Sequence, residues 1–440
     1  MKRLLPLLAM GILTSCQLGI PTLPPTPNGS FVPGTVLVQF KSGTSQKTIQ
    51  SINQAVGVTQ SSTVTSHGLW NISVPSGQER AYMRRYMDHP QVAYVDYARL
   101  LSTEMVGGFR PYLGRAVQTT APNDPLYGPD PLNPTTGARE VGLPGQWGLN
   151  AMDVLDAWNK TQGSNVKVAV LDTGVDMGHP DLAANLDTAD AYNFVDNNTN
   201  PDDDYGHGTH VTGIIAAVAN NQVGVAGVAP ACKVMPIRVL GVEGGSTVNL
   251  IQGIEWAIDH GAKAINISLG SDQYDQAEAD EINRAIASDV VVVAAAGNDA
   301  LTGDPLSYPG ALPGVVSVAA LQQDLDANGN PTGTYSRASF SDFNPFVTVA
   351  APGVDILSTV PRRFQSYGTT HSDEPYAYAS GTSMAAPMVT GVVALIRSAH
   401  PDWTASQVIS DLRSTAQQLG TGPFNQFYGS GLVQAAKAVR

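Results

Sequence analysis

The feature that most constrains the fold is a series of short, largely apolar runs beyond residue 165. Four of these runs are Val166–Leu171, Ala262–Ile267, Val290–Ala295 and Val315–Ala319. Stretches with helical periodicity lie between or after them, at about 209–219, 247–260, 276–288 and 383–399. Strands that are apolar on both faces must be covered on both faces. The pattern therefore predicts an α/β fold, a three-layer sandwich with a mostly parallel central sheet.

A smaller unit precedes this domain. The alternation of patterns predicts, in order, a strand, a helix, two strands, a helix and a strand, at Thr35–Phe40, Ser45–Val56, Ser61–Thr65, Leu69–Val74, Gln78–Asp88 and Val92–Tyr97. This βαββαβ order is typical of a small α+β ferredoxin-like domain at 35–97. Residues 98–123 are interpreted as an irregular linker and candidate processing region, and 124–440 as the main domain.

The N-terminus, MKRLLPLLAMGILTSC, has two basic residues followed by an apolar run too short to span a bilayer. This pattern indicates an export signal at 1–16. The segment ending at Cys16 resembles a bacterial lipoprotein signal, in which the cysteine becomes lipid-modified, and an ordinary signal peptide is the alternative. The Pro-rich residues 17–34 are interpreted as an extended tether. We expect a secreted, extracellular protein, anchored to the cell envelope through Cys16 before maturation.

Composition limits the class of protein. The chain has a formal net charge of −13, and its acidic surplus lies beyond residue 123, because residues 1–123 carry ten Lys or Arg and four Asp or Glu. An acidic main domain argues against nucleic-acid binding. The chain has only two cysteines, so once Cys16 is lipidated or removed, Cys232 has no partner for a disulfide. In an apolar stretch, Cys232 is expected to be a buried apolar residue rather than a reactive thiol.

Three segments carry residues suited to acid–base and nucleophilic chemistry. Asp172 ends an apolar strand, where α/β active sites assemble, although a turn or helix cap would also use Asp. His207 begins a helical run, which favours a neutral imidazole able to act as a base, and the spacing to His210 leaves metal ligation as an alternative. Ser383 precedes a long apolar helix. It could be a nucleophile that lies beside the free N–H groups of the helix N-terminus, or it could be a simple N-cap.

The segments DTGVDMGHPDL, GHGTHVTG and SGTSMAAP, in that order, resemble the three active-site blocks of subtilisin-like serine peptidases, the subtilases, especially their thermitase-like branch. The resemblance covers about 120–440. It implies a serine endopeptidase with Asp172, His207 and Ser383 as a catalytic triad acting through an acyl-enzyme. It also implies that Asn298, in VVVAAAGND, donates to the oxyanion, and that His179 is structural.

The same resemblance implies how an extended protein or peptide substrate binds. Ser268, Leu269 and Gly270 correspond to one edge that pairs with the substrate backbone, and Gly244, Gly245 and Ser246 to the opposing edge. Ser307 corresponds to the base of the primary pocket, which we expect to be roomy and uncharged. A broad specificity with a preference for large apolar side chains is the resulting hypothesis.

Structural calcium is also implied, because hard oxygen ligands can stabilise loops in a protein without disulfides. The loop NNQVGVAGVAP resembles the tight calcium loop of the family. The implied ligands of this first site are the side chains of Asp124, Asp181 and Asn221 and the carbonyls of Ala219, Val223 and Val225. A second, thermitase-type site is suggested at Asp196, Asn198 and Asp202, where clustered Asp and Asn are equally good turn formers.

The unit at 35–97 resembles the inhibitor-type propeptide of these enzymes, whose last residues occupy the active-site cleft until they are cut. The resemblance implies a monomeric zymogen that cleaves itself between about 98 and 123 and so separates the enzyme from any lipid on Cys16. An inactive scaffold protein is expected to lack at least one of the four residues that the chemistry needs. This chain has all four, Asp172, His207, Ser383 and Asn298. A serine-carboxyl peptidase would have Glu at position 207 and Asp at position 298. A narrow processing peptidase stays open, because loop shapes set the specificity.

Overall fold

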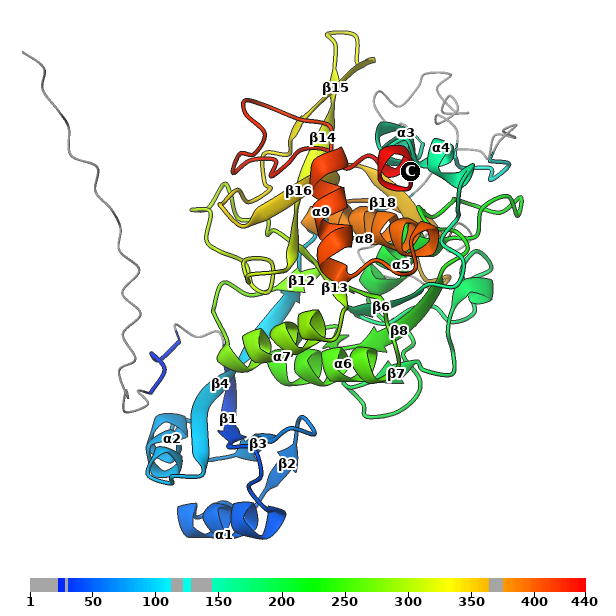
Figure 1. Ribbon diagram of the computed structural model, residues 1–440. Coiled ribbons are helices and arrows are strands. Elements are labelled where there is room, and N and C mark those ends of the chain that lie inside the picture. The colour runs from blue at the N-terminus through cyan, green and yellow to red at the C-terminus, as the bar shows by residue number, and fades with distance from the viewer. Residues whose placement is uncertain (1–22, 28–30, 112–121, 128–144, 364–374) are drawn as a thin grey trace, which may run out of the picture.

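A mainly parallel sheet forms the centre of the larger domain (Figure 1). The structure is a computed structural model that describes residues 23–27, 31–111, 122–127, 145–363 and 375–440. The strand order is β15-β14-β13-β11-β6-β8-β7, with β16 also pairing with β14. All pairs are parallel except β14 with β15. The strands are β6 (Lys167–Asp172), β7 (Tyr192–Asn193), β8 (Lys233–Arg238), β11 (Ala264–Ile267), β13 (Val291–Ala295), β14 (Val316–Leu325), β15 (Pro331–Arg337) and β16 (Val347–Pro352).

Helices cover both faces of this sheet, as the apolar strands predicted. Along β6, Val168 and Val170 join one core with α5 (His207–Ala216) and α8 (Thr382–Ala399). Ala169 and Leu171 alternate with them and join a second core with α6 (Thr247–Asp259) and α7 (Gln276–Ala287). Side chains of a strand alternate between its faces, so one strand supplies both cores. The predicted three-layer α/β fold is confirmed.

Helix α8 is the core helix of one layer. Within the described ranges it is the one helix long and apolar enough to cross a membrane, and 89% of that stretch is buried inside the protein. Its apolar character therefore reflects its place against the sheet. The remaining helices of the domain are α3 (Trp147–Ala151), α4 (Val154–Trp158), α9 (Ala405–Thr415), α10 (Ala435–Ala438) and the 3₁₀ turn Ala183–Asn185. The short strands of this domain outside the central sheet are β9 (Leu240–Gly241), β10 (Gly244–Ser246), β12 (Leu269–Gly270), β17 (Ile356–Thr359) and β18 (Tyr376–Ser380).

The N-terminal unit has the predicted βαββαβ order. It consists of β1 (Phe31–Phe40), α1 (Gln46–Val56), β2 (Ser61–Thr63), β3 (Leu69–Ser73), α2 (Glu79–Met87) and β4 (Val92–Thr103). The strands pair antiparallel in the order β2-β3-β1-β4. Val36 and Val38 of β1 face a core under the two helices, whereas Leu37 faces the opposite way. This small sheet therefore has two apolar faces.

The second apolar face of the N-terminal unit packs on the larger domain. Leu37, Leu69 and Ala98 form one buried cluster with Val248 and Ile251 of α6 and Ala277 of α7. Polar contacts surround this cluster. The side chain of Asp96 accepts a hydrogen bond of 3.2 Å from the Gln276 backbone N–H in the first turn of α7, and His67 lies 3.2 Å from Glu281.

Two of the predicted boundaries differ from the structure. Residues 31–34, predicted as tether, belong to β1, and Pro24 accepts a hydrogen bond of 3.0 Å from Arg80, so residues 23–27 lie against the N-terminal unit. Residues 98–103, predicted as irregular, continue β4, because the larger domain supplies pairing partners for them. Residues 106–111 form β5 (Val106–Pro111). The predicted signal at 1–16, with Cys16, lies outside the described residues.

Candidate active site

The predicted acid and base form a buried pair. Asp172 ends β6 and His207 begins α5, and Asp172 Oδ1 lies 2.7 Å from His207 Nδ1. Both residues are fully buried. Gly208 allows this approach, because a Cβ there would lie 2.1 Å from the carbonyl oxygen of Gly174. The carboxylate holds the imidazole with Nε2 directed away from it, which is the arrangement a general base requires.

Ser383 lies in the first turn of α8 and is fully buried. Its hydroxyl donates a hydrogen bond of 2.8 Å to the carbonyl oxygen of Ser268, and Nε2 of His207 has no hydrogen-bond partner among the described residues. The serine hydroxyl therefore bonds Ser268 rather than His207 in this structure. Asp172 and His207 form the predicted pair, and the assignment of Ser383 as its nucleophile stays a prediction.

The backbone N–H of Ser383 holds a carbonyl oxygen from the chain itself. It donates a hydrogen bond of 2.9 Å to the carbonyl oxygen of Glu104, at the N-terminal end of α8. A free N–H at a helix N-terminus stabilises negative charge on such an oxygen. The side chain of Asn298 lies beside it, with its Oδ1 accepting hydrogen bonds from the backbone N–H and the hydroxyl of Thr382 at 3.0 and 3.1 Å. Its Nδ2 donates to the Glu104 carboxyl at 3.2 Å.

The residues before Glu104 occupy the groove predicted for an extended substrate. In β4, Leu100 and Leu101 pair with Ser246 and Gly245 of β10, and Ser102 and Thr103 pair with Gly270 and Leu269 of β12. The N–H of Glu104 donates to the carbonyl oxygen of Ser268 at 3.2 Å. Ser268, Leu269, Gly270, Gly245 and Ser246 therefore contact this segment by strand addition, whereas Gly244 pairs with Gly241 of β9. After Glu104 the chain continues into β5, which pairs with β18.

The primary pocket holds the Glu104 side chain. Ser307 Oγ donates to Glu104 Oε1 at 3.3 Å, which agrees with the predicted position of Ser307 in this pocket. Burial of the carboxyl and the nearby Asp299 raise the pKa of Glu104 to about 7. Asp342, a fully buried residue, places a second carboxyl close to this pocket, because a Cβ on Gly297 would lie 2.0 Å from Asp342 Oδ2 and 2.9 Å from Ser307 Cβ. Asp342 was missed because it lies in no active-site motif and meets Gly297 only through the fold.

The first predicted calcium site brings its side chains together. Asp181 Oδ1 accepts a hydrogen bond of 2.7 Å from Asn221, and Asp124 accepts from the backbone N–H groups of Asn220 and Asn221. Burial, together with the neighbouring Asp124, raises the pKa of Asp181 to about 7. Two buried acids with one loop between them fit a hard cation, which would supply the missing positive charge. Among the described residues, no group of three or more His, Cys, Asp or Glu is placed to hold a metal ion, and this first site has only two such side chains.

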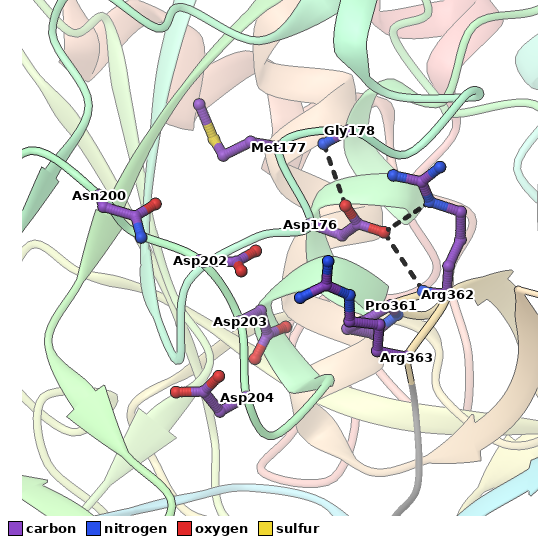
Figure 2. Close-up of a pocket in the computed structure, with 10 residues that line it drawn as sticks. All are labelled: Asp176, Met177, Gly178, Asn200, Asp202, Asp203, Asp204, Pro361, Arg362 and Arg363. Atoms are coloured by element: carbon purple, nitrogen blue, oxygen red, sulfur yellow. Dashed lines mark hydrogen bonds and ion pairs between the residues drawn. The ribbon is translucent and has the colours of Figure 1, made fainter.

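The side chains predicted for a second calcium site serve other contacts. Asp196 accepts a hydrogen bond from Asn193 at 3.0 Å, and Asn198 accepts one from the Asn200 backbone at 2.8 Å, as in turns. Figure 2 shows Asp202 in a pocket with the Asp176–Arg362 ion pair, and neither Asp196 nor Asn198 lines that pocket. The alternative interpretation of this segment as turn formers accounts for the contacts of Asp196 and Asn198.

His210, His179 and Cys232 are buried and have structural rather than chemical roles. His210 Nε2 lies 3.0 Å from the carbonyl oxygen of Ala377, and burial lowers the pKa of His210 to about 3, which leaves the metal alternative for this pair unsupported. Burial lowers the pKa of His179 to about 4, with its ring between Pro375 and the Asp181 backbone. Cys232 is fully buried, and burial raises the pKa of its thiol to about 12, so it is not a reactive thiol.

Comparison with known proteins agrees with this geometry. Residues 163–431 match the model of the subtilase family, and residues 21–97 match that of the fervidolysin N-terminal prodomain. The chain is 40% identical over 308 residues to the M-protease of Shouchella clausii, covering 70% of this chain and 72% of that one. It is 40% identical over 296 residues to Subtilisin Savinase of Lederbergia lenta, covering 67% of this chain and 98% of that one.

A solved structure extends the similarity to both domains. The crystal structure of fervidolysin from Fervidobacterium pennivorans, described as a keratinolytic enzyme related to subtilisin, superimposes with a TM-score of 0.75 at 30% sequence identity. The alignment covers 95% of this chain and 62% of the fervidolysin chain. The chain thus resembles fervidolysin through its N-terminal unit as well as its larger domain.

Proposed function

The chain belongs to the subtilase family as a serine endopeptidase made with an N-terminal prodomain, and from that membership we propose which residues carry the reaction and which bond the chain cuts in itself. The single observation that carries the proposal is the hydrogen bond from the Ser383 N–H to the Glu104 carbonyl oxygen. A peptide carbonyl held there lies where a serine nucleophile attacks.

The proposed reaction is acyl transfer to Ser383. After rotating away from Ser268, the Ser383 hydroxyl gives its proton to His207 and attacks the carbonyl carbon, while Asp172 stabilises the imidazolium. The Ser383 N–H and the Asn298 amide stabilise the oxyanion, an effect for which subtilisin itself is the standard measured case. His207 then protonates the leaving amine, and water hydrolyses the acyl-enzyme.

The proposed self-cleavage site is the bond between Glu104 and Met105. Residues 100 and 101 pair with β10 and residues 102 and 103 pair with β12, the two edges predicted for a substrate strand, and the chain then continues into β5. This bond lies inside the range 98–123 expected for processing. The freed prodomain, ending at Glu104, keeps its apolar and polar contacts with α6 and α7 and so acts as an inhibitor until it dissociates.

The experiment is maturation of the full-length chain. Wild type should produce a mature form beginning at Met105 and cleave casein, and a serine-directed sulfonyl fluoride should inhibit it. Ser383→Ala should stay full length, whereas Ser414→Ala, on the exposed side of α9, should mature like wild type. A mature form produced by Ser383→Ala at the wild-type rate contradicts the proposed nucleophile. A different N-terminal residue contradicts the proposed bond alone.

We also propose structural calcium at Asp124, Asp181, Asn221 and the loop carbonyls, and export with lipidation at Cys16. Bound there, calcium would supply positive charge that neutralises the two buried carboxylates. Because Cys16 lies on the N-terminal side of Glu104, self-cleavage would release the enzyme from its lipid. Mass analysis of the released enzyme tests this, since a mature form that still carries Cys16 contradicts release.

A further inference from the structure

We propose that Asp342 is a specificity-determining residue of the primary pocket, where it makes acceptance of a glutamate before the cleaved bond depend on one proton shared by two carboxyl groups. The inference rests on the proposed function, because it takes Glu104 as the residue whose side chain fills that pocket. A peptidase of broad specificity would then accept glutamate in this pocket only when the proton is present. Apolar and amide side chains would bind with or without it.

Two glycines and Ser307 place both carboxyls at one end of the pocket. A Cβ on Gly270 would lie 2.5 Å from Ser307 Oγ and 3.0 Å from Glu104 Oε1. A Cβ on Gly297 would lie 2.9 Å from Ser307 Cβ and 2.0 Å from Asp342 Oδ2. The Glu104 carboxyl and the Asp342 carboxyl therefore both lie near Ser307. The first is next to Gly270 and the second is next to Gly297, where a side chain would leave no room for it.

Asp342 differs from an ordinary structural aspartate. It is fully buried, and no side chain in the part of the chain that the structure describes donates a hydrogen bond to its carboxyl group. A buried carboxylate without a positive partner costs free energy, unless it is protonated or meets a ligand. Burial, with further increases from Asp304, Glu104 and Asp299, outweighs the opposing effect of the Asp299 backbone N–H and raises the pKa of Asp342 to about 8.

The charged groups around the pair do not supply a cation for Asp342. Asp299 and Asp304 add negative charge, and the influence of His207 lowers the pKa of Glu104 only in part. Arg337, the nearest cation along the chain, donates to the carbonyl oxygens of Ala338 and Ser341 and lies over the ring of Phe343. A glutamate in this pocket thus meets carboxyls rather than a positive partner.

The electrostatic consequence is a coupled pair. Two carboxyls that approach each other in a buried site cannot both ionise without a large cost, so the pair with glutamate bound keeps one proton. Once it is lost at higher pH, two negative charges face each other and glutamate is rejected. Glutamine has the same shape without the charge, so ionisation of Asp342 affects it far less.

The test uses mature wild-type enzyme and Asp342→Asn on quenched peptides with the sequence of residues 99–108. The residue before the cleaved bond is Glu, Gln or Leu, and kcat/KM is measured from pH 5.5 to 9.5. The ratio of the Glu to the Gln rate on one enzyme cancels the titration of His207 and any general loss of activity. We expect this ratio to fall more than tenfold for wild type and less than about threefold for Asp342→Asn, whose side chain is uncharged at every pH.

A ratio that stays within threefold in wild type, or that falls as steeply in Asp342→Asn, overturns the inference. If Asp342→Asn does not fold, the precursor Glu104→Gln serves instead, and its maturation rate relative to wild type should rise more than tenfold between pH 6 and 9. A constant ratio of the two maturation rates overturns the inference. Failure of wild type to cleave any of the three peptides would instead contradict the proposed function.

Discussion

The backbone N–H of Ser383 lies 2.9 Å from the carbonyl oxygen of Glu104, so the proposed nucleophile of this chain holds a peptide group of the same chain. Between the two residues the chain forms every strand of the central sheet and helices α5, α6 and α7, and α8 begins only at Thr382. The prodomain thus reaches the site by the extended route that a substrate would use. What distinguishes it from a substrate is the second contact surface on α6 and α7.

Thr382 is expected to act as a positioning residue for Asn298. Its hydroxyl donates to Asn298 Oδ1 at 3.1 Å and accepts from the Gly297 N–H at 3.3 Å. Thr382→Val removes both bonds, so kcat should fall about fivefold, corresponding to about 1 kcal/mol, with little change in KM. Thr382→Ser keeps the hydroxyl and should recover most of the rate. A change confined to KM would contradict a role in orienting the oxyanion donor.

His67 is expected to make release of the cleaved prodomain depend on pH. Hydrogen bonds to Glu255 and Glu281 of the larger domain raise its pKa from 6.5 to about 9. Because the bound state has the higher pKa, the contribution is complete below pH 6.5 and is lost as pH rises through 9. The prodomain should therefore dissociate about two to five times faster at pH 9.5 than at 6.5, a modest effect since His67 is 40% exposed.

The measurement for His67 is recovery of peptidase activity after the self-cleaved complex is diluted, followed at several pH values. His67→Gln should remove the difference between pH 6.5 and 9.5. His89→Gln, which changes another prodomain histidine, should keep it. An equal pH dependence in all three proteins would assign it to another group.

Calcium removal is expected to destabilise the larger domain. In the Ser383→Ala background, which prevents self-digestion, a chelator should lower the unfolding temperature by about 5–10 °C, since a ligand at 100 times its Kd stabilises by about 2.7 kcal/mol. Calcium should restore the unfolding temperature and magnesium should not. Asp181→Asn should abolish the response to the chelator. An Asp181→Asn protein that still responds fully would place the ion elsewhere.

Asn266 is expected to stabilise the attachment of α8 to the central sheet. Its side chain is fully buried, accepts a hydrogen bond of 2.8 Å from Thr390 of α8, and donates at 2.9 Å to Ser268, which donates to the Ser383 carbonyl oxygen. Asn266→Ala should lower the free energy of unfolding by about 1–3 kcal/mol in the Ser383→Ala background, measured by urea denaturation. A loss below 0.5 kcal/mol, within ordinary surface effects, would contradict this role.

The sequence predicted those parts of the fold and site whose signals are local. Val166–Leu171 is apolar except for Lys167, so β6 and the position of Asp172 at its end followed directly. The helices beginning at His207 and Thr382 were predicted within two residues of their observed starts. The βαββαβ order of the prodomain was likewise predicted, since each of its elements carries its own periodicity.

Features that depend on pairing between distant segments were not predictable. Residues 98–103 have no strand pattern that distinguishes them from a linker, and they form β4 because β10 and β12 lie on either side. The proximity of Asp342 to Ser307 depends on how the loops after β13 and β15 fold together. The orientation of the Ser383 hydroxyl toward Ser268 is a rotamer choice that no motif encodes.

Strand β4 runs without a break from the prodomain sheet into the groove, and this continuity makes inhibition intramolecular before the cut. While the chain is intact, the groove and strand β4 belong to one molecule, so their effective concentration is set by the covalent connection between them. Dilution of the protein cannot change it. Once the bond after Glu104 is cut, the same contacts become a two-body equilibrium governed by the concentration of free prodomain. Dilution of the processed complex then becomes a signal for activation, in addition to the cleavage itself.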